Sequence, residues 1–138
     1  MARATGRTQP CSAGQGLTRL DHARRFVDVA ELVAGQGEDR EYASVSAPLA
    51  VLAGIAAADA ACCRALGRRS RGQDHHQAEE LVAQVEPGGR QASNALRRLL
   101  DLKDEAHYGF FDVGGNDLQA ALRQATALVK FADDVLRR

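Results

Sequence analysis

Apolar residues recur every three or four positions along most of the chain, the spacing that places them on one face of an α-helix. One series predicts a helix over about residues 18–34, ending at the Gly35-Gln36-Gly37 breaker. Its apolar face consists of Leu20, Ala23, Val27, Ala30 and Ala34. A longer series predicts a last helix capped by Asn116. That series consists of Leu118, Ala121, Leu122, Ala125, Leu128, Val129, Ala132 and Val135.

The segment 47–58 is different, because it contains no charged side chain at all. With about 12 residues it is shorter than the ~20 that cross a bilayer, so it predicts a central buried helix. Pro48 lies near its start, where the missing N–H does no harm. Its many alanines allow neighbouring helices to approach closely.

Two more helices complete the pattern. A short one is expected after a cap at Asp74, ending at Pro87-Gly88-Gly89, and a longer one ends at Gly109. No segment predicts a strand, so the expected fold class is all-α, an up-and-down helical bundle of four main helices plus one shorter helix. Residues 1–16 predict a flexible N-terminal tail without the apolar core of a secretory signal, and residues 17–138 form the bundle.

Composition is that of one globular domain: 138 residues, 45% hydrophobic, 26% charged and a net charge of zero. This balance argues against a uniformly basic polyanion binder and leaves local patches to consider. Sixteen of the eighteen basic residues are Arg, which indicates either phosphate recognition or a coding bias.

The three cysteines are odd in number, and the adjacent Cys62 and Cys63 are poorly placed to pair with each other. A reducing cytoplasm is the compartment we expect.

Lys103 interrupts the apolar face of its helix, with His107 one turn later towards the edge of that face. An unpaired buried ammonium is expensive. Asp59 is the only charge between residues 47 and 63. We therefore predict a structural ion pair between Asp59 and Lys103, with a hydrogen-bonding role for His107 as the plainest alternative to catalysis.

Three short motifs, ADAACCRALG, GQDHHQAEELV and LKDEAHYG, resemble the HEPN superfamily of small helical bundles over roughly residues 18 to 138. The resemblance implies a helical bundle, and many members are endoribonucleases, often toxins, that bring an Arg and a His together across a dimer interface. His107 takes the place of the family histidine, but no basic residue stands at the family spacing before it. The segment is more similar to non-catalytic branches of the superfamily.

The resemblance implies Lys103, Asp104, His107 and Tyr108 as candidate catalytic residues. His107 would act as general acid or base, and Lys103 would stabilise a pentavalent phosphate. The leading hypothesis is a cytoplasmic binding or interaction module associated with a toxin–antitoxin or nucleotide-handling system. Its candidate partners are RNA or a nucleotide and a cognate antitoxin or nucleotidyltransferase-like protein. The alternatives are a metal-independent endoribonuclease and a structural partner protein without a nucleic-acid role.

A homodimer is expected, because Tyr108, Phe110 and Phe111 supply half of the chain's six aromatic residues beside the motif. No cofactor, metal or membrane contact is expected. His75 and His76 lie near Glu79 and Glu80, but two-ligand pairs at helical spacing are common by chance.

A run of arginines is the candidate nucleic-acid-binding site. Arg64, Arg68, Arg69 and Arg71 occur with no acidic residue between positions 60 and 73, so they could bind RNA phosphates or an acidic partner. The alternative is a solvated basic helix end that complements the helix dipole.

Overall fold

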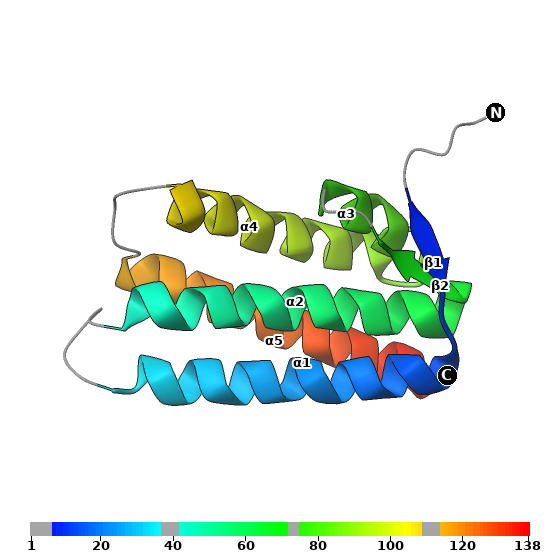
Figure 1. Ribbon diagram of the computed structural model, residues 1–138, viewed down its shortest axis with the longest axis horizontal. Coiled ribbons are helices and arrows are strands. Elements are labelled where there is room, and N and C mark those ends of the chain that lie inside the picture. Colours follow the sequence, from blue (N-terminus) through cyan, green and yellow to red (C-terminus); the bar gives the residue numbers. More distant parts are fainter. Residues whose placement is uncertain (1–6, 37–41, 72–74, 109–113) are drawn as a thin grey trace.

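The computed structural model describes residues 7–36, 42–71, 75–108 and 114–138, without the side chains of 104–108. Within these residues the chain forms five helices and two short strands (Figure 1). The helices are α1 (Ala13–Ala34), α2 (Ala43–Leu66), α3 (His76–Val82), α4 (Gly89–Tyr108) and α5 (Gly115–Leu136). The strands are β1 (Thr8–Pro10) and β2 (Arg68–Ser70). The predicted all-α class, with four long helices and one short helix, is confirmed.

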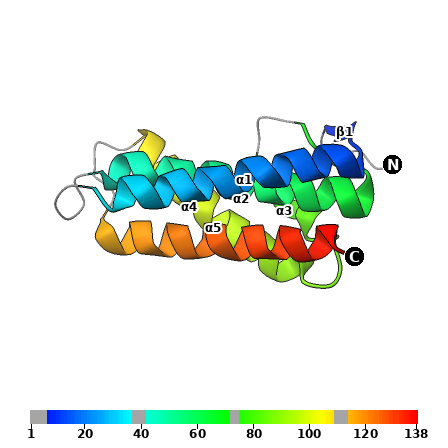
Figure 2. The same ribbon diagram turned by 90° about the horizontal axis from the view of Figure 1, so that it is seen from below.

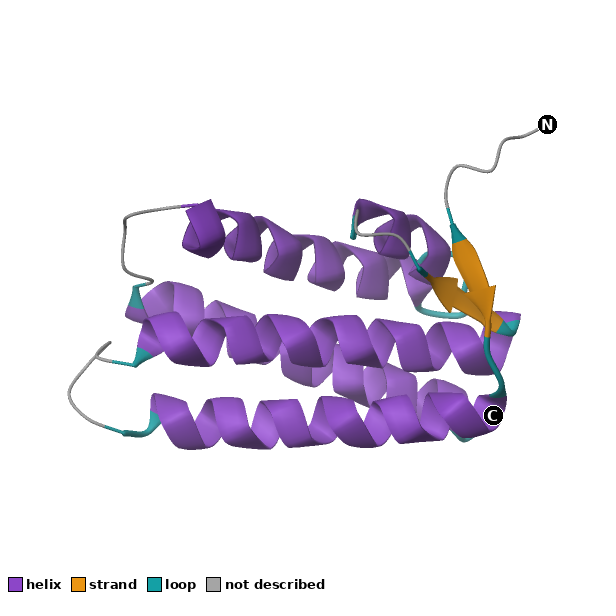
Figure 3. Ribbon diagram, viewed as in Figure 1, coloured by secondary structure: helices purple, strands orange, loops and turns teal. Residues whose placement is uncertain are grey.

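The four long helices run alternately up and down, and the two views in Figures 1 and 2 agree on this arrangement. Helix α2 lies at the centre and packs against α1, α4 and α5. The small sheet and α3 lie together at one end of the bundle, beside the start of α1 and the end of α2 (Figure 3). The opposite end contains the end of α1, the start of α2 and the end of α4.

The alanines of α2 explain its central position. Ala50, Ala53, Ala56, Ala57 and Ala60 are completely buried, and their small side chains bring neighbouring helices close. Among the described residues, α2 is the helix long and apolar enough to cross a membrane by length and composition alone. However, 72% of its most apolar window is buried inside the bundle. We therefore interpret α2 as a core helix.

Helix α5 buries the face that its sequence pattern predicted. Its buried residues are Leu118, Ala121, Ala125, Leu128, Ala132 and Val135, and they pack mainly against α2. Leu122 and Val129 are half-buried at the edges of that face. The helix begins one residue after Gly114, so the predicted cap at Asn116 is wrong. The predicted cap at Asp74 and the helix end at Gly109 lie outside the described residues.

The N-terminal segment differs from its prediction. Residues 8–16 are part of the fold, and α1 begins at Ala13 rather than near Thr18. Ser12 and Gln15 form the capping box that starts the helix: the N–H of Gln15 donates to Ser12 Oγ at 3.0 Å, and the N–H of Ser12 donates to Gln15 Oε1 at 2.9 Å. This capping box lies upstream of Thr18 and Asp21, whose spacing resembles a capping box and suggested the predicted start of the helix.

The strands were not expected from the sequence either. Strand β1 pairs antiparallel with β2, and Gln9 lies opposite Arg69. Both strands have three residues and no alternation of apolar and polar side chains, so the period-two pattern that indicates a strand is missing. Their pairing brings the start of the described chain against the end of α2.

Candidate functional site

The four predicted nucleic-acid-binding arginines gather at one end of the bundle. Arg64 lies in the last turn of α2, Arg68 and Arg69 form most of β2, and Arg71 follows directly. Arg64 and Arg71 are exposed, and the two strand residues are half-buried. We call this group the arginine end. The helix dipole accounts for Arg64, but the other three arginines lie beyond the end of α2.

Two of these arginines, Arg68 and Arg69, are held by neutral amide and carbonyl groups, and Arg64 contacts the last residue of the sequence. Arg69 donates from Nη2 to Gln9 Oε1 at 3.1 Å and from Nη1 to the backbone oxygen of Ser70 at 3.2 Å. Arg68 donates to Gln84 Oε1 at 3.4 Å, and Arg64 donates to the backbone oxygen of Arg138. Among the described residues, none of the four forms an ion pair with an Asp or Glu side chain. In the described part of the chain, no side-chain carboxylate therefore neutralises these arginines through an ion pair.

Asp59 forms an ion pair with Arg19 of α1. Nε and Nη2 of Arg19 both lie 3.4 Å from Asp59 Oδ2. The predicted pair of Asp59 with Lys103 is wrong, since no ion pair joins these two described residues. Leu102, which precedes Lys103 in α4, packs beside Ala43 and Ala47 at the start of α2. Asp59 lies in the second half of α2, so antiparallel packing places the two charges at different levels of the bundle.

The environment of Asp59 opposes ionisation. Burial raises the pKa of this carboxyl above its ordinary value of 3.8, while Arg19 and then Arg69 lower it by smaller amounts. Both guanidinium groups therefore act on the same carboxylate. Arg69 links the buried ion pair to the arginine end.

A disulfide joins Cys11, just before α1, to Cys63 of α2 across 52 residues of sequence, with a Cα–Cα distance of 5.2 Å. Sequence reasoning considered the adjacent pair Cys62–Cys63 and missed this one, because no local pattern brings residue 11 to residue 63. Cys62 is the remaining free cysteine and is buried. Burial, with a smaller effect of Asp59, raises the pKa of its thiol to about 12, so it is a poor nucleophile.

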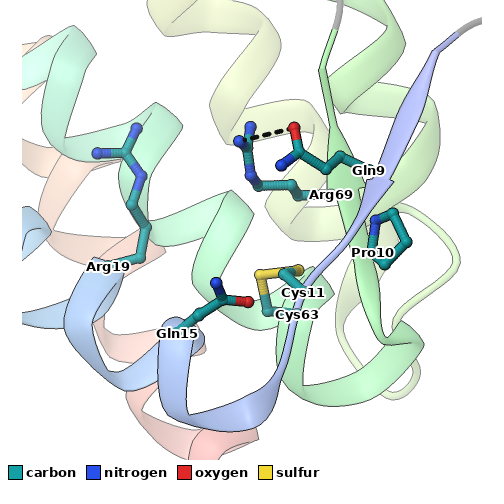
Figure 4. Close-up of a pocket in the computed structure, with 7 residues that line it drawn as sticks. All are labelled: Gln9, Pro10, Cys11, Gln15, Arg19, Cys63 and Arg69. Carbon is teal, nitrogen blue, oxygen red and sulfur yellow. Dashed lines mark hydrogen bonds between the residues drawn. A yellow bond between two sulfur atoms is a disulfide. The ribbon is translucent and has the colours of Figure 1, made fainter.

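A cavity of about 260 Å³ lies against this disulfide. Arg19 and Gln15, one turn apart on α1, line it together with Gln9 of β1 and Arg69 of β2. Pro10, Cys11 and Cys63 complete the lining. In Figure 4, Arg19 extends from α1 and Arg69 from β2, with Gln15 beside the disulfide. We call this the disulfide cavity. Sequence reasoning identified Arg69 alone among its polar side chains.

His76 forms a local contact, since its Nδ1 lies 2.7 Å from Glu79 Oε2. The two residues are three positions apart, one of the spacings that place side chains on the same face of a helix. Across the described ranges, no group of three or more His, Cys, Asp or Glu side chains is placed to hold a metal ion.

The candidate catalytic residues lie at the other end of the molecule. Lys103 is half-buried in the last turns of α4. Asp104, His107 and Tyr108 belong to the end of the same helix, but their side chains, and the whole of Phe110 and Phe111, lie outside the described part of the chain. Their roles stay predictions. Figure 1 shows that this end of α4 is far from the strands.

No family model, curated protein or solved structure matches this chain. The HEPN resemblance therefore rests on the short sequence motifs, and function must be argued from the sites described above.

Proposed function

We propose that this protein is a non-catalytic RNA-binding module that contacts the phosphate backbone through its arginine end. The observation that supports this proposal is that four guanidinium groups occur within eight residues, and none is paired with a carboxylate side chain among the described residues. Neutral partners orient Arg68 and Arg69 and leave their charge intact.

Guanidinium groups suit this task because their planar N–H donors match the oxygens of a phosphate. Contacts of this kind position an RNA strand without reading its sequence. With six aromatic residues in the whole chain, stacking on bases is a minor contribution. We therefore expect binding to be weakly sequence-dependent and strongly salt-dependent.

Fluorescence anisotropy with a labelled single-stranded RNA tests the proposal. Arg68→Gln and Arg71→Gln should each weaken binding several-fold and reduce the slope of log K against log salt concentration by about 0.7. Arg123→Gln is the matched control, because Arg123 is an exposed arginine of α5 away from the arginine end. Equal weakening in the control, or no RNA binding by the wild-type protein, would contradict the proposal.

The endoribonuclease alternative depends on a different residue and needs its own assay. We expect wild-type protein to leave the labelled RNA intact after prolonged incubation without metal. RNA cleavage that is lost in His107→Ala would establish the catalytic alternative. By resemblance, we also propose that the module works as a homodimer beside a toxin–antitoxin or nucleotide-handling partner.

A further inference from the structure

The side chains of the disulfide cavity present an unusual excess of hydrogen-bond donors. Gln15 uses its Oε1 to accept from the N–H of Ser12, and Gln9 uses its Oε1 to accept from Arg69. Each amide oxygen is thus engaged, and the orientation of each amide is fixed by the donor that it meets. The Nε2 groups of both side chains can therefore donate hydrogen bonds to a ligand.

The two arginines of the cavity also retain donors. A guanidinium has five N–H bonds. Arg19 directs Nε and Nη2 to Asp59 at 3.4 Å, longer than the ~2.7–2.9 Å of a strong charge-assisted bond. Its Nη1 has no protein partner among the described residues. Arg69 has used one bond from each of its two terminal nitrogens.

The charge of this region favours an anion. Two guanidinium groups line the cavity, and the carboxylate that pairs with Arg19, Asp59, is buried and is not part of the lining. Like charges on the walls of a small cavity repel each other, and a bound anion relieves that repulsion. The volume of about 260 Å³ is below the ~300–1,000 Å³ typical of drug-sized ligands, so it suits a small ion with its waters.

We propose that the disulfide cavity is a binding site for a phosphate oxyanion, held between Arg19 and Arg69 with the Nε2 groups of Gln9 and Gln15 as additional donors. The phosphate is either the free ion or the terminal phosphate of a larger molecule. This site shares Arg69 with the arginine end, but the other three arginines proposed to contact the RNA backbone, Arg64, Arg68 and Arg71, do not line it. It does not require the protein to bind RNA.

Titration of the oxidised, isotope-labelled protein with sodium phosphate, followed by amide NMR shifts at constant ionic strength, tests the proposal. We expect saturable shifts concentrated at residues 9–15 and 63–69. Arg69→Gln should weaken phosphate binding about tenfold, the loss of one charge-assisted contact. Arg68→Gln is the matched control: it removes the same charge from the same strand, but Arg68 bonds to Gln84 outside the cavity.

Gln9→Glu provides a second test, because we expect this variant to fold at least as stably as the wild-type protein. The new carboxylate would pair with Arg69 and repel the oxyanion, so phosphate binding should be lost while thermal stability is kept or raised. A 5′-phosphorylated RNA compared with its 5′-hydroxyl form then distinguishes the two sources. If the wild-type protein binds the 5′-phosphorylated RNA more tightly and Gln9→Glu abolishes this difference, the ligand of the cavity is a terminal phosphate. If the wild-type protein binds both RNAs with equal affinity, the ligand is the free phosphate ion.

Three results would overturn the site. These are the absence of saturable shifts, equal weakening by Arg68→Gln and Arg69→Gln, and undiminished phosphate binding by Gln9→Glu. Each can occur whether or not the protein binds RNA, and RNA binding can fail while the phosphate titration succeeds. The two proposals therefore stand or fall separately.

Discussion

Asp59 is a buried carboxylate among alanines, and its protonation should control part of the stability of the fold. Its pKa in the folded protein is raised above 3.8, chiefly by burial. The folded state therefore holds this proton more tightly than the unfolded chain. The resulting contribution to stability is fully present below the unfolded pKa and is lost as the pH rises through the folded pKa.

We predict that wild-type protein loses free energy of unfolding relative to Asp59→Asn as the pH is raised from about 3 to 7. Urea denaturation of both proteins at each pH measures this difference. A pH-independent difference would show that the arginines balance the effect of burial on this pKa, and a difference of opposite sign would show that they outweigh it.

The two members of the Arg19–Asp59 pair should respond unequally to substitution at neutral pH. Arg19→Gln leaves a buried carboxylate without its ion pair and should lower the free energy of unfolding by about 1–2 kcal/mol, less than for a fully buried pair because Arg19 is partly exposed. Asp59→Asn should change it by less than about 1 kcal/mol, since the guanidinium can turn to solvent. Arg25→Gln, which breaks an exposed pair with Asp21, is the control, with an expected effect of at most about 0.5 kcal/mol.

Thiol counting tests the oxidation state at the level of single residues. Native protein should react with a thiol reagent very slowly, because Cys62 is buried and its pKa is about 12. Protein unfolded without reductant should show one thiol per chain, and prior reduction should raise the count to three. Three thiols before reduction would agree instead with the reducing compartment expected from the sequence.

At the scale of elements, the disulfide ties β1 and the start of α1 to α2. Closing a loop of 52 residues restricts the unfolded chain by about 4 kcal/mol in the chain-entropy model. We predict that dithiothreitol lowers the melting temperature of the wild-type protein by about 14 °C. Cys11→Ser should melt at the temperature of reduced wild-type protein, and reductant should not lower it further. Coincident melting curves for oxidised and reduced wild-type protein would refute this stabilisation.

Helix α2 approaches its neighbours closely at Gly54. A Cβ added there would meet the Leu99 side chain of α4 and would lie 3.2 Å from Leu128 Cδ1 of α5. Both leucines are buried, so we predict that Gly54→Ala lowers the free energy of unfolding by about 1–3 kcal/mol. Gly14→Ala, in the exposed first turn of α1, should be neutral or stabilising because alanine favours helix. Equal effects in the two variants would contradict close packing at Gly54.

The elements differ in how far the sequence reveals them. The face of α5 and the core position of α2 follow from local patterns, since both depend on residues within one segment. The disulfide, the pairing of β1 with β2 and the Arg19–Asp59 contact join residues 40 or more positions apart, and no periodicity encodes such contacts. The disulfide cavity depends on all three, which explains why most of its residues were not identified from the sequence.

At the scale of the whole molecule, the two ends of the bundle differ in chemistry. Arginines gather at the end with the strands. At the other end, Leu32 near the end of α1 and Tyr42 and Val45 at the start of α2 are large apolar residues exposed to solvent. Helix α4 also ends there, and the aromatic segment predicted to form an interface follows it. Apolar and aromatic residues of this kind are typical of the core of a protein interface.

We therefore predict that the protein is a dimer through the end opposite the arginines. Light scattering at tens of micromolar should return twice the chain mass of 14.8 kDa. Leu32→Asp should shift the protein to monomer, because a carboxylate buried in an apolar interface lacks a partner. Leu17→Asp is the matched control: Leu17 is equally a solvent-exposed leucine of α1 but lies near the arginine end. A monomer mass for the wild-type protein would exclude the dimer and, with it, the shared interface on which the endoribonuclease alternative depends. A shift to monomer in both variants would exclude the proposed position of the interface.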